Sequence, residues 1–213
     1  MTHRLKRVCF ALSLALAVFA MTGGRASAQS NGSRQVMDEF HDVLLDVMRD
    51  PAIGYSGRYA RLTAAADRTF HLPVMTQVSA GNFWRDAPQI QRQALIAAFT
   101  HYGISLLARN FSGDGIKQFD TVAERPGPQN TTLVDARLVR KNGSDIDITY
   151  VLKPHAGSWR VVDVILDRGI SELALRQSEF SHGLSNGGLP VLTATLNGKA
   201  EEFAQAASVV EIK

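Results

Sequence analysis

Two hydrophobic periodicities divide the chain after residue 28. Over 33–49, apolar residues recur every three or four positions, which predicts an amphipathic helix that Ser33 can cap. Further helices are predicted over about 58–70, from Pro73, and over about 86–110. The longest carries one apolar stripe made of Leu95, Ala98, Phe99, Tyr102 and Leu106. Since a second apolar stripe lies beside it, we expect this helix to be covered on two sides.

From Gly115 the hydrophobic period changes to two, which predicts β-strands. Four strands are predicted, over about 115–124, 131–140, 144–153 and 158–167. The short, turn-rich connections favour an antiparallel meander. Because the last strand has apolar residues on both faces, we expect it to be central in the sheet.

Two more helices, over about 170–184 and 189–196, and a short terminal one are predicted to follow the strands. The chain then has a helical part at about 33–110, a sheet at about 115–167 and C-terminal helices at 170–208. This order predicts an α+β fold, in which a curved antiparallel sheet of about four strands is packed with helices.

The first 28 residues have the pattern of an export signal. A basic segment, 1–7, precedes an apolar segment, 8–21, and Ala26-Ser27-Ala28 supplies the small residues that a signal peptidase reads. We therefore predict cleavage before Gln29 and an exported protein with one domain over 29–213. An uncleaved anchor is the alternative, which the apolar segment disfavours because it is shorter than the roughly 20 residues of a membrane-spanning helix.

Composition and charge narrow the function classes. With 45% hydrophobic and 20% charged residues, the chain is neither disordered nor a disulfide scaffold. The formal charge of +3 depends on four basic residues within 1–28; the remainder has 19 basic and 20 acidic side chains, so we expect no nucleic-acid partner. Cys9 lies in the predicted signal, so the exported chain has no thiol chemistry.

Candidate catalytic groups are few. The histidines are scattered, and the HExxH, GxSxG, P-loop and dinucleotide motifs are absent. Asp145 and Asp147 could form a carboxylate pair, but a solvated strand face is favoured. Asp163 stands among valines, either as a catalytic base or, as we favour, in an ion pair with Arg168 or Arg176. We predict no catalytic site, metal or cofactor.

Several short motifs, taken in order, resemble one protein family. They are Phe83-Trp84-Arg85, Gln91-Arg92, Phe99, Trp159-Arg160-Val161-Val162-Asp163-Val164, Gly169-Ile170-Ser171, Arg176-Gln177-Ser178-Glu179-Phe180 and Gly187-Gly188. Between about Val36 and Ala200 the chain is similar to the Mla-pathway periplasmic lipid-binding proteins, the MlaC or toluene-tolerance family. The Arg176–Phe180 motif, with its extra residue and Glu179, looks more like the hopanoid-associated, HpnM-like branch.

The resemblance implies an NTF2/cystatin-like sheet with a small helical subdomain, enclosing an apolar cavity for lipid tails. It also implies a carrier of phospholipid or hopanoid between an inner-membrane ABC transporter complex and an outer-membrane lipoprotein complex. An exported chain with apolar faces and no catalytic motif suits this role, and we expect it to be a monomer. Two alternatives remain: an NTF2-like enzyme in which Tyr102, Tyr150 and Asp163 converge in a small pocket, or an adaptor with an ordinary core.

We predict that lipid tails contact the long helix and the inner face of the sheet. The predicted contact residues are Phe99, Tyr102, Leu106, Tyr150, Val162, Val164 and Leu166. The helical residues share one stripe, and Val162, Val164 and Leu166 share one strand face if alternation is regular. The alternative is that half of these residues belong to an ordinary core.

Overall fold

The structure is a computed structural model that describes residues 32–113 and 115–211. The predicted signal peptide and its cleavage site lie outside these residues. The α-helices are α1 (Ser33–Arg49), α2 (Gly54–Thr69), α3 (Leu72–Ala80), α4 (Gln89–Asn110) and α5 (Glu172–Glu211). The strands are β1 (Ile116–Pro126), β2 (Thr132–Arg140), β3 (Ile146–His155), β4 (Ser158–Leu166) and β5 (Ile170–Ser171). Short 3-10 helices are η1 (Gly81–Trp84), η2 (Pro128–Asn130) and η3 (Asp167–Gly169).

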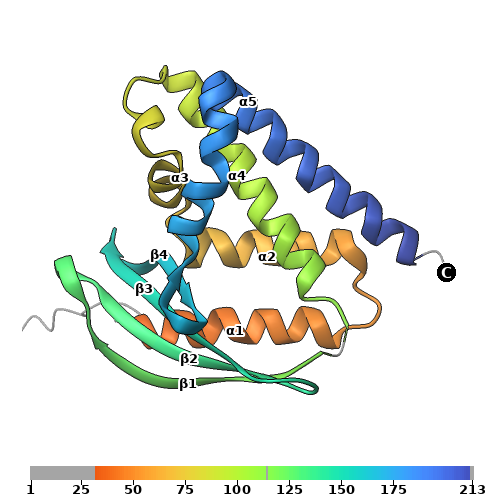
Figure 1. Ribbon diagram of the computed structural model, residues 1–213. Helices are drawn as coiled ribbons and strands as arrows, with labels where there is room; N and C mark the ends of the chain where they lie inside the picture. Colours follow the sequence, from red (N-terminus) through yellow and green to blue (C-terminus); the bar gives the residue numbers. More distant parts are fainter. Residues whose placement is uncertain (1–31, 114, 212–213) are drawn as a thin grey trace, which may run out of the picture.

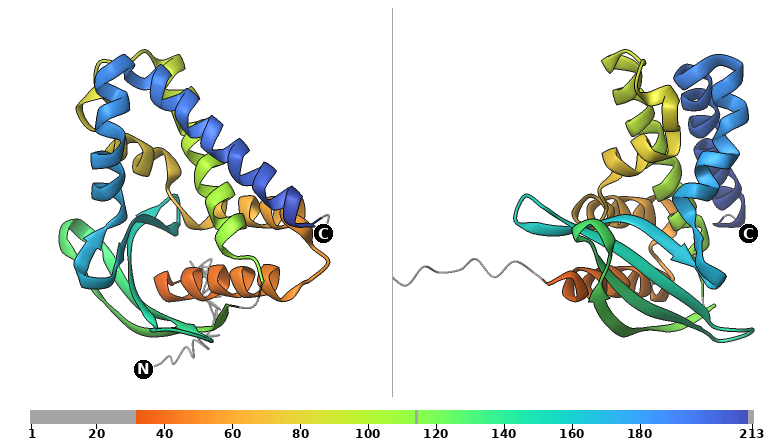
Figure 2. Two further views of the ribbon diagram at one scale, coloured as in Figure 1. Left: turned by 45° about the vertical axis from the view of Figure 1, so that its right-hand side comes forward. Right: turned by 60° about the vertical axis from the view of Figure 1, so that its left-hand side comes forward.

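The elements form the predicted α+β fold. A curved, unclosed antiparallel sheet carries α1 on its concave side, and α3, α4 and α5 form a helical subdomain beyond it (Figure 1). Figure 2 shows from two further directions that this subdomain stands over one face of the sheet. The four predicted strands are confirmed to within two residues at each end, and β5 adds a fifth strand of two residues.

The sheet is the predicted meander, with strand order β1-β2-β3-β4-β5 and antiparallel neighbours throughout. The expectation that the last long strand is central was wrong: among the described residues, β4 is flanked on its far side only by the two-residue β5 and by a single bridge to Phe70. The apolar residues of β4 are covered by helices instead, since α1, α2, α3 and α5 all contact this strand. Within β4, the carbonyl oxygen of Val161 accepts a hydrogen bond from the backbone N–H of His71 at 2.8 Å.

Buried apolar residues form two cores. The first joins the concave face of the sheet to α1 and α2, and the second lies within the helical subdomain. Helix α4 belongs to both: Ile104 and Ala108 pack in the first core, whereas Leu95 and Phe99 pack in the second. The prediction that this helix is covered on two sides is confirmed.

The N-terminal helices differ from prediction in their starts. Gly32, not Ser33, occupies the cap position of α1, and the Ser33 hydroxyl donates instead to Glu124 Oε1 at 2.6 Å. Helix α2, predicted from about residue 58, begins four residues earlier at Gly54, so Gly57 lies inside the helix. A Cβ on Gly57 would lie 2.7 Å from Cγ1 of Ile53, which shows that this glycine admits the isoleucine side chain against the first turn.

The separate helices predicted after the sheet are present as the two segments of α5. This element spans Glu172–Glu211, and its two helical segments meet at a kink at Gly187 and Gly188. Gly188 has φ 67° and ψ −157°, a conformation open essentially to glycine alone, and a Cβ on Gly187 would clash with Cγ2 of Val191. Beyond the kink the helix returns alongside α4, where Phe203 packs near Tyr102 with ring centroids 5.9 Å apart (Figure 1).

Asp163 fastens the start of α5 to β4. Its carboxylate accepts three hydrogen bonds. The donors are the Ser171 hydroxyl at 2.7 Å, the Leu173 backbone N–H at 3.3 Å and the Val164 backbone N–H at 2.8 Å. Of the two expected ion-pair partners, Arg176 was wrong, because it pairs with Glu172 at 3.1 Å and with Glu179 at 2.6 Å, and the side chain of Arg168 lies outside the described part of the chain. Asp163 therefore has a structural role of the helix-capping kind.

We expect Asp163→Ala to lower the free energy of unfolding by about 2 kcal/mol, because the donors on Ser171 and Leu173 lose their shared acceptor. Urea denaturation monitored by circular dichroism measures this change. Asp147→Ala is the matched control: Asp147 lies on the same sheet in an exposed ion pair with Arg137, which contributes little. Equal losses of stability in the two variants would contradict the capping role.

Candidate functional site

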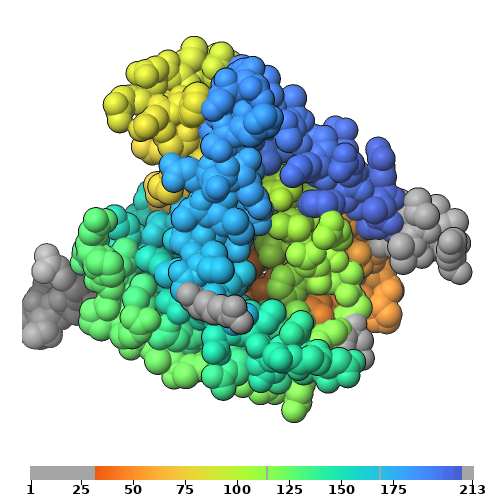
Figure 3. All heavy atoms as spheres, in the orientation of Figure 1, coloured from red at the N-terminus to blue at the C-terminus, as the bar shows by residue number. Residues whose placement is uncertain are grey.

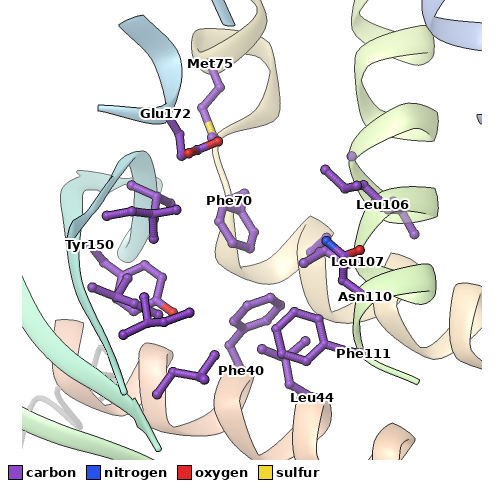
Figure 4. A pocket seen from close by; sticks show the side chains of 18 of the residues that line it. Phe40, Leu44, Phe70, Met75, Leu106, Leu107, Asn110, Phe111, Tyr150 and Glu172 are labelled. Atoms are coloured by element: carbon purple, nitrogen blue, oxygen red, sulfur yellow. The ribbon is translucent and has the colours of Figure 1, made fainter. Parts of the chain in front are cut away.

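A large apolar cavity lies between the two cores. Its volume is about 570 Å³, within the range of small-molecule sites, and its walls come from α1, α2, α4, the sheet and the start of α5. In Figure 4 the side chains of Phe40, Phe70, Leu106 and Tyr150, from four parts of the chain, surround the common space. Figure 3 shows the surface hollowed between α4 and the first part of α5.

The interior of this cavity is almost entirely apolar. Its polar lining side chains are those of Thr100, Tyr102, Asn110, Arg140, Tyr150, Glu172 and Arg176 among the described residues. Asn110 and Arg140 are exposed and so lie at the mouth, whereas Glu172 and Arg176 are partly buried and bonded to each other. Since unpaired polar groups are costly in such surroundings, the interior suits hydrocarbon rather than a polar substrate.

Six of the seven predicted contact residues lie on the wall of this cavity. They are Phe99, Tyr102 and Leu106 of α4, Tyr150 of β3, and Val164 and Leu166 of β4. The structure thus brings together side chains from both predicted surfaces, the long helix and the sheet. That they contact lipid stays a prediction.

Val162 is the exception, because a β-bulge interrupts β4. Leu152 of β3 pairs with Val161 rather than with Val162, so Val162 is the extra residue of the strand. Val161, with 0% of its surface exposed, takes the inward position, and regular alternation resumes at Val164 and Leu166. The prediction that Val162 shares their face was wrong.

Sequence reasoning missed the part of the wall opposite α4. It consists mainly of Phe40, Leu44, Phe70, Phe111, Ile116, Phe119, Leu138, Ile146 and Ile148. Phe40 lies on the buried face of the helix predicted over 33–49, but the apolar periodicity of that helix does not reveal whether the face meets a filled core or a cavity. Phe111, which follows the last residue of α4, and Phe119, inside β1, carried no comparable signal.

A buried polar pair adjoins the cavity. His41 Nε2 lies 3.0 Å from the Tyr150 hydroxyl, and the His41 ring stacks on Phe119 at a centroid distance of 4.2 Å. Burial lowers the pKa of His41 to about 4, against a smaller opposing effect of the Asp38 carboxylate, and burial raises the pKa of Tyr150. Both groups are therefore neutral at pH 7, and this part of the wall carries no charge.

The pKa of His41 predicts a loss of stability on acidification. Its ordinary value is 6.5 and its value in the fold is about 4, so between these pH values the unfolded chain binds more protons than the folded one. The free energy of unfolding should fall by about 3 kcal/mol from this group as the pH drops from about 6.5 to 4.

Chemical denaturation across this pH range tests the expectation. His41→Gln should flatten the pH dependence, whereas His182→Gln, which removes an exposed histidine of α5, should leave it as in the wild type. If the wild type and His41→Gln lose the same stability between these pH values, the assignment to His41 is wrong.

The enzyme alternative required Tyr102, Tyr150 and Asp163 to converge in one pocket. Tyr102 and Tyr150 line the cavity, but Asp163, the third residue of the enzyme alternative, does not. Asp147 is exposed and bonded to Arg137 Nε at 2.8 Å, as expected of a solvated face. In the same residues no cluster of three or more histidine, cysteine or acidic side chains could hold a metal ion. None of the described helices combines the length and hydrophobicity needed to cross a bilayer.

The protein is of the α+β class and is built around an interior space. An open, curved sheet and a helical subdomain enclose an apolar cavity of a size that holds a ligand. A family model described as MlaC protein matches residues 36–198, and the chain belongs to this family. The family resemblance inferred from the sequence motifs is thereby confirmed, while membership of the hopanoid-associated branch stays a prediction.

A solved structure shares the fold. It is the phospholipid-binding protein from Ralstonia solanacearum in complex with a phospholipid, with a TM-score of 0.63 and 20% sequence identity. The alignment covers 83% of this chain and 99% of that one, so sheet and helical subdomain are both matched. At 20% sequence identity, the structural similarity between the two proteins establishes that they share a fold.

Proposed function

We propose that this protein is a periplasmic carrier that binds phospholipid by its acyl tails and catalyses no reaction. The observation that carries the proposal is the apolar cavity of about 570 Å³ between sheet and helices, in a chain of the MlaC family. The phospholipid bound to the Ralstonia protein supports a phospholipid as the ligand. The predicted export signal is consistent with the periplasm.

The tails supply the binding free energy in this proposal. Two acyl chains contain roughly thirty methylenes, and full transfer from water at about 0.8 kcal/mol each is worth on the order of 24 kcal/mol. Even half of this value equals the free energy of a nanomolar complex, about 12 kcal/mol. Release into water is then too slow for transport, so the carrier hands its lipid over while docked.

Docked transfer requires a donor and an acceptor. We propose an inner-membrane ABC transporter complex and an outer-membrane lipoprotein complex as these partners, following the family resemblance. The chain after residue 28 has nearly balanced charge, 19 basic against 20 acidic residues. A polybasic attraction to bare anionic membranes is therefore not expected, and recognition falls to the partner proteins.

The proposal is tested by identifying the molecule that the protein carries. The secreted protein is purified without detergent, extracted with organic solvent and analysed by mass spectrometry. We expect a phospholipid in near-stoichiometric amount. A hopanoid in its place would overturn the phospholipid assignment and support the branch predicted from Arg176–Phe180, and lipid-free protein would contradict the carrier role altogether.

A further inference from the structure

The cavity opens where the ends of α4 and β2 meet the start of β1. Asn110 ends α4 and Arg140 ends β2, and both line the cavity while remaining exposed. Arg140 pairs with Ile116 across the sheet, and the next residue, Lys141, donates its backbone N–H to the Gly115 carbonyl oxygen at 3.0 Å. The backbone on this side of the mouth is therefore fixed by sheet hydrogen bonds.

The Arg140 side chain is oriented but not neutralised. Its Nε donates to the carbonyl oxygen of Ser144 in the β2–β3 turn, while Asp145 accepts from the Arg140 backbone N–H at 3.2 Å. Within the described part of the chain, neither Nη atom has a hydrogen-bond partner, and no carboxylate forms an ion pair with the guanidinium. Two donor groups thus remain available on a cation at the mouth.

Arg176, the other arginine on the cavity wall, differs in this respect. Its guanidinium is paired with Glu172 and Glu179 and lies over the Tyr102 ring at 5.9 Å, so its charge is already compensated. At the mouth, Asn110 adds a polar group beside Arg140: its Oδ1 accepts from Arg109 Nε at 3.4 Å, which leaves the amide N–H groups to donate. The mouth therefore presents donors, where the interior presents hydrocarbon.

We propose that Arg140 binds the phosphate of a phospholipid headgroup at the mouth while the tails occupy the cavity. The inference rests on the proposed function and narrows it to lipids with an anionic phosphodiester. The planar guanidinium fork matches phosphate oxygens, and charge-assisted bonds of this kind are about twice as strong as neutral ones. A neutral lipid, such as a diacylglycerol or a hopanoid without phosphate, leaves these donors unused.

A competition between two lipids that differ only in the headgroup tests the proposal. Delipidated mature protein is incubated with vesicles containing equal amounts of phosphatidylglycerol and diacylglycerol with identical acyl chains, and the bound lipids are quantified by mass spectrometry. The wild type should prefer phosphatidylglycerol, and Arg140→Gln should reduce this preference about tenfold, the size of one charge-assisted hydrogen bond. Diacylglycerol uptake should stay unchanged, which reports that the variant is folded.

Arg137→Gln is the matched control. Arg137 lies on the same strand, pairs with Asp147 at 2.8 Å and does not line the cavity, so the preference should persist. Equal uptake of both lipids by the wild type, or an undiminished preference in Arg140→Gln, would overturn the proposal. Uptake of neither lipid by the wild type would instead contradict the proposed function.

A third arm distinguishes a lipid headgroup from free phosphate. Excess inorganic phosphate should leave the preference intact, because the tails hold the headgroup at the mouth at a high effective concentration. If inorganic phosphate abolishes the preference, Arg140 binds the free anion and its assignment to a lipid headgroup is wrong.

Discussion

Replacing Val164 by tryptophan should reduce the lipid that co-purifies with the protein by about tenfold or more. Val164 pairs with Tyr150 across β3 and β4, and both side chains line the cavity. A tryptophan side chain would occupy space that tails need, and each excluded methylene costs about 0.8 kcal/mol, so that two of them already account for a tenfold loss. The measurement is lipid content per protein after detergent-free purification.

Because of the β-bulge, a control variant can be made only two residues away on the same strand. Val162→Trp places the same side chain two residues away, at a position that does not line the cavity, and should leave the lipid content unchanged. Circular dichroism establishes that both variants fold. A folded Val164→Trp protein with wild-type lipid content, or an equal loss in the two variants, would contradict the assignment of the cavity to lipid tails.

Lipid transfer should depend strongly on the partner complexes. If the tails contribute on the order of 10 kcal/mol or more, their passage through open water is slow, and acceptor liposomes alone should receive little lipid. Addition of the inner- or outer-membrane complex should accelerate transfer by more than about tenfold, because the tails then pass directly between proteins. Transfer is followed with a fluorescent phospholipid preloaded into the protein.

Delipidated protein mixed with the same complexes controls for lipid that the complexes themselves release. Rapid transfer from loaded protein to liposomes without any partner would show that the cavity opens unaided. That result would contradict docked transfer while leaving the lipid-binding proposal intact.

The elements of the fold could be predicted because their hydrophobic periods are regular. In α4, the stripe of Leu95 and Phe99 and the second stripe of Ile104 are covered by different cores, as a helix apolar on two faces requires. The helix start that was predicted wrongly, that of α2, lies beside glycines. The helix predicted from about residue 58 begins at Gly54 and contains Gly57, whose lack of a side chain admits Ile53, a contact that the local pattern does not reveal.

The site could be predicted only in part, for two physical reasons. Alternation placed Val164 and Leu166 correctly on the wall but failed at Val162, because a bulge changes which residues face inward without leaving a clear trace in composition. Periodicity also indicates which side chains point inward, not whether neighbours fill the space beyond them. Phe40 and Leu44 therefore looked like core residues, although they also line the cavity.

The most direct test of the central claim is to locate the tails within the protein. Delipidated protein is loaded with a phospholipid brominated on its acyl chains and crystallised, and the bromine positions are found by anomalous scattering. We expect bromine between α4 and the concave face of the sheet, near Phe40, Leu106 and Val164. Bromine outside this cavity, or ordinary side chains filling the space in a protein that still binds lipid, would contradict the account.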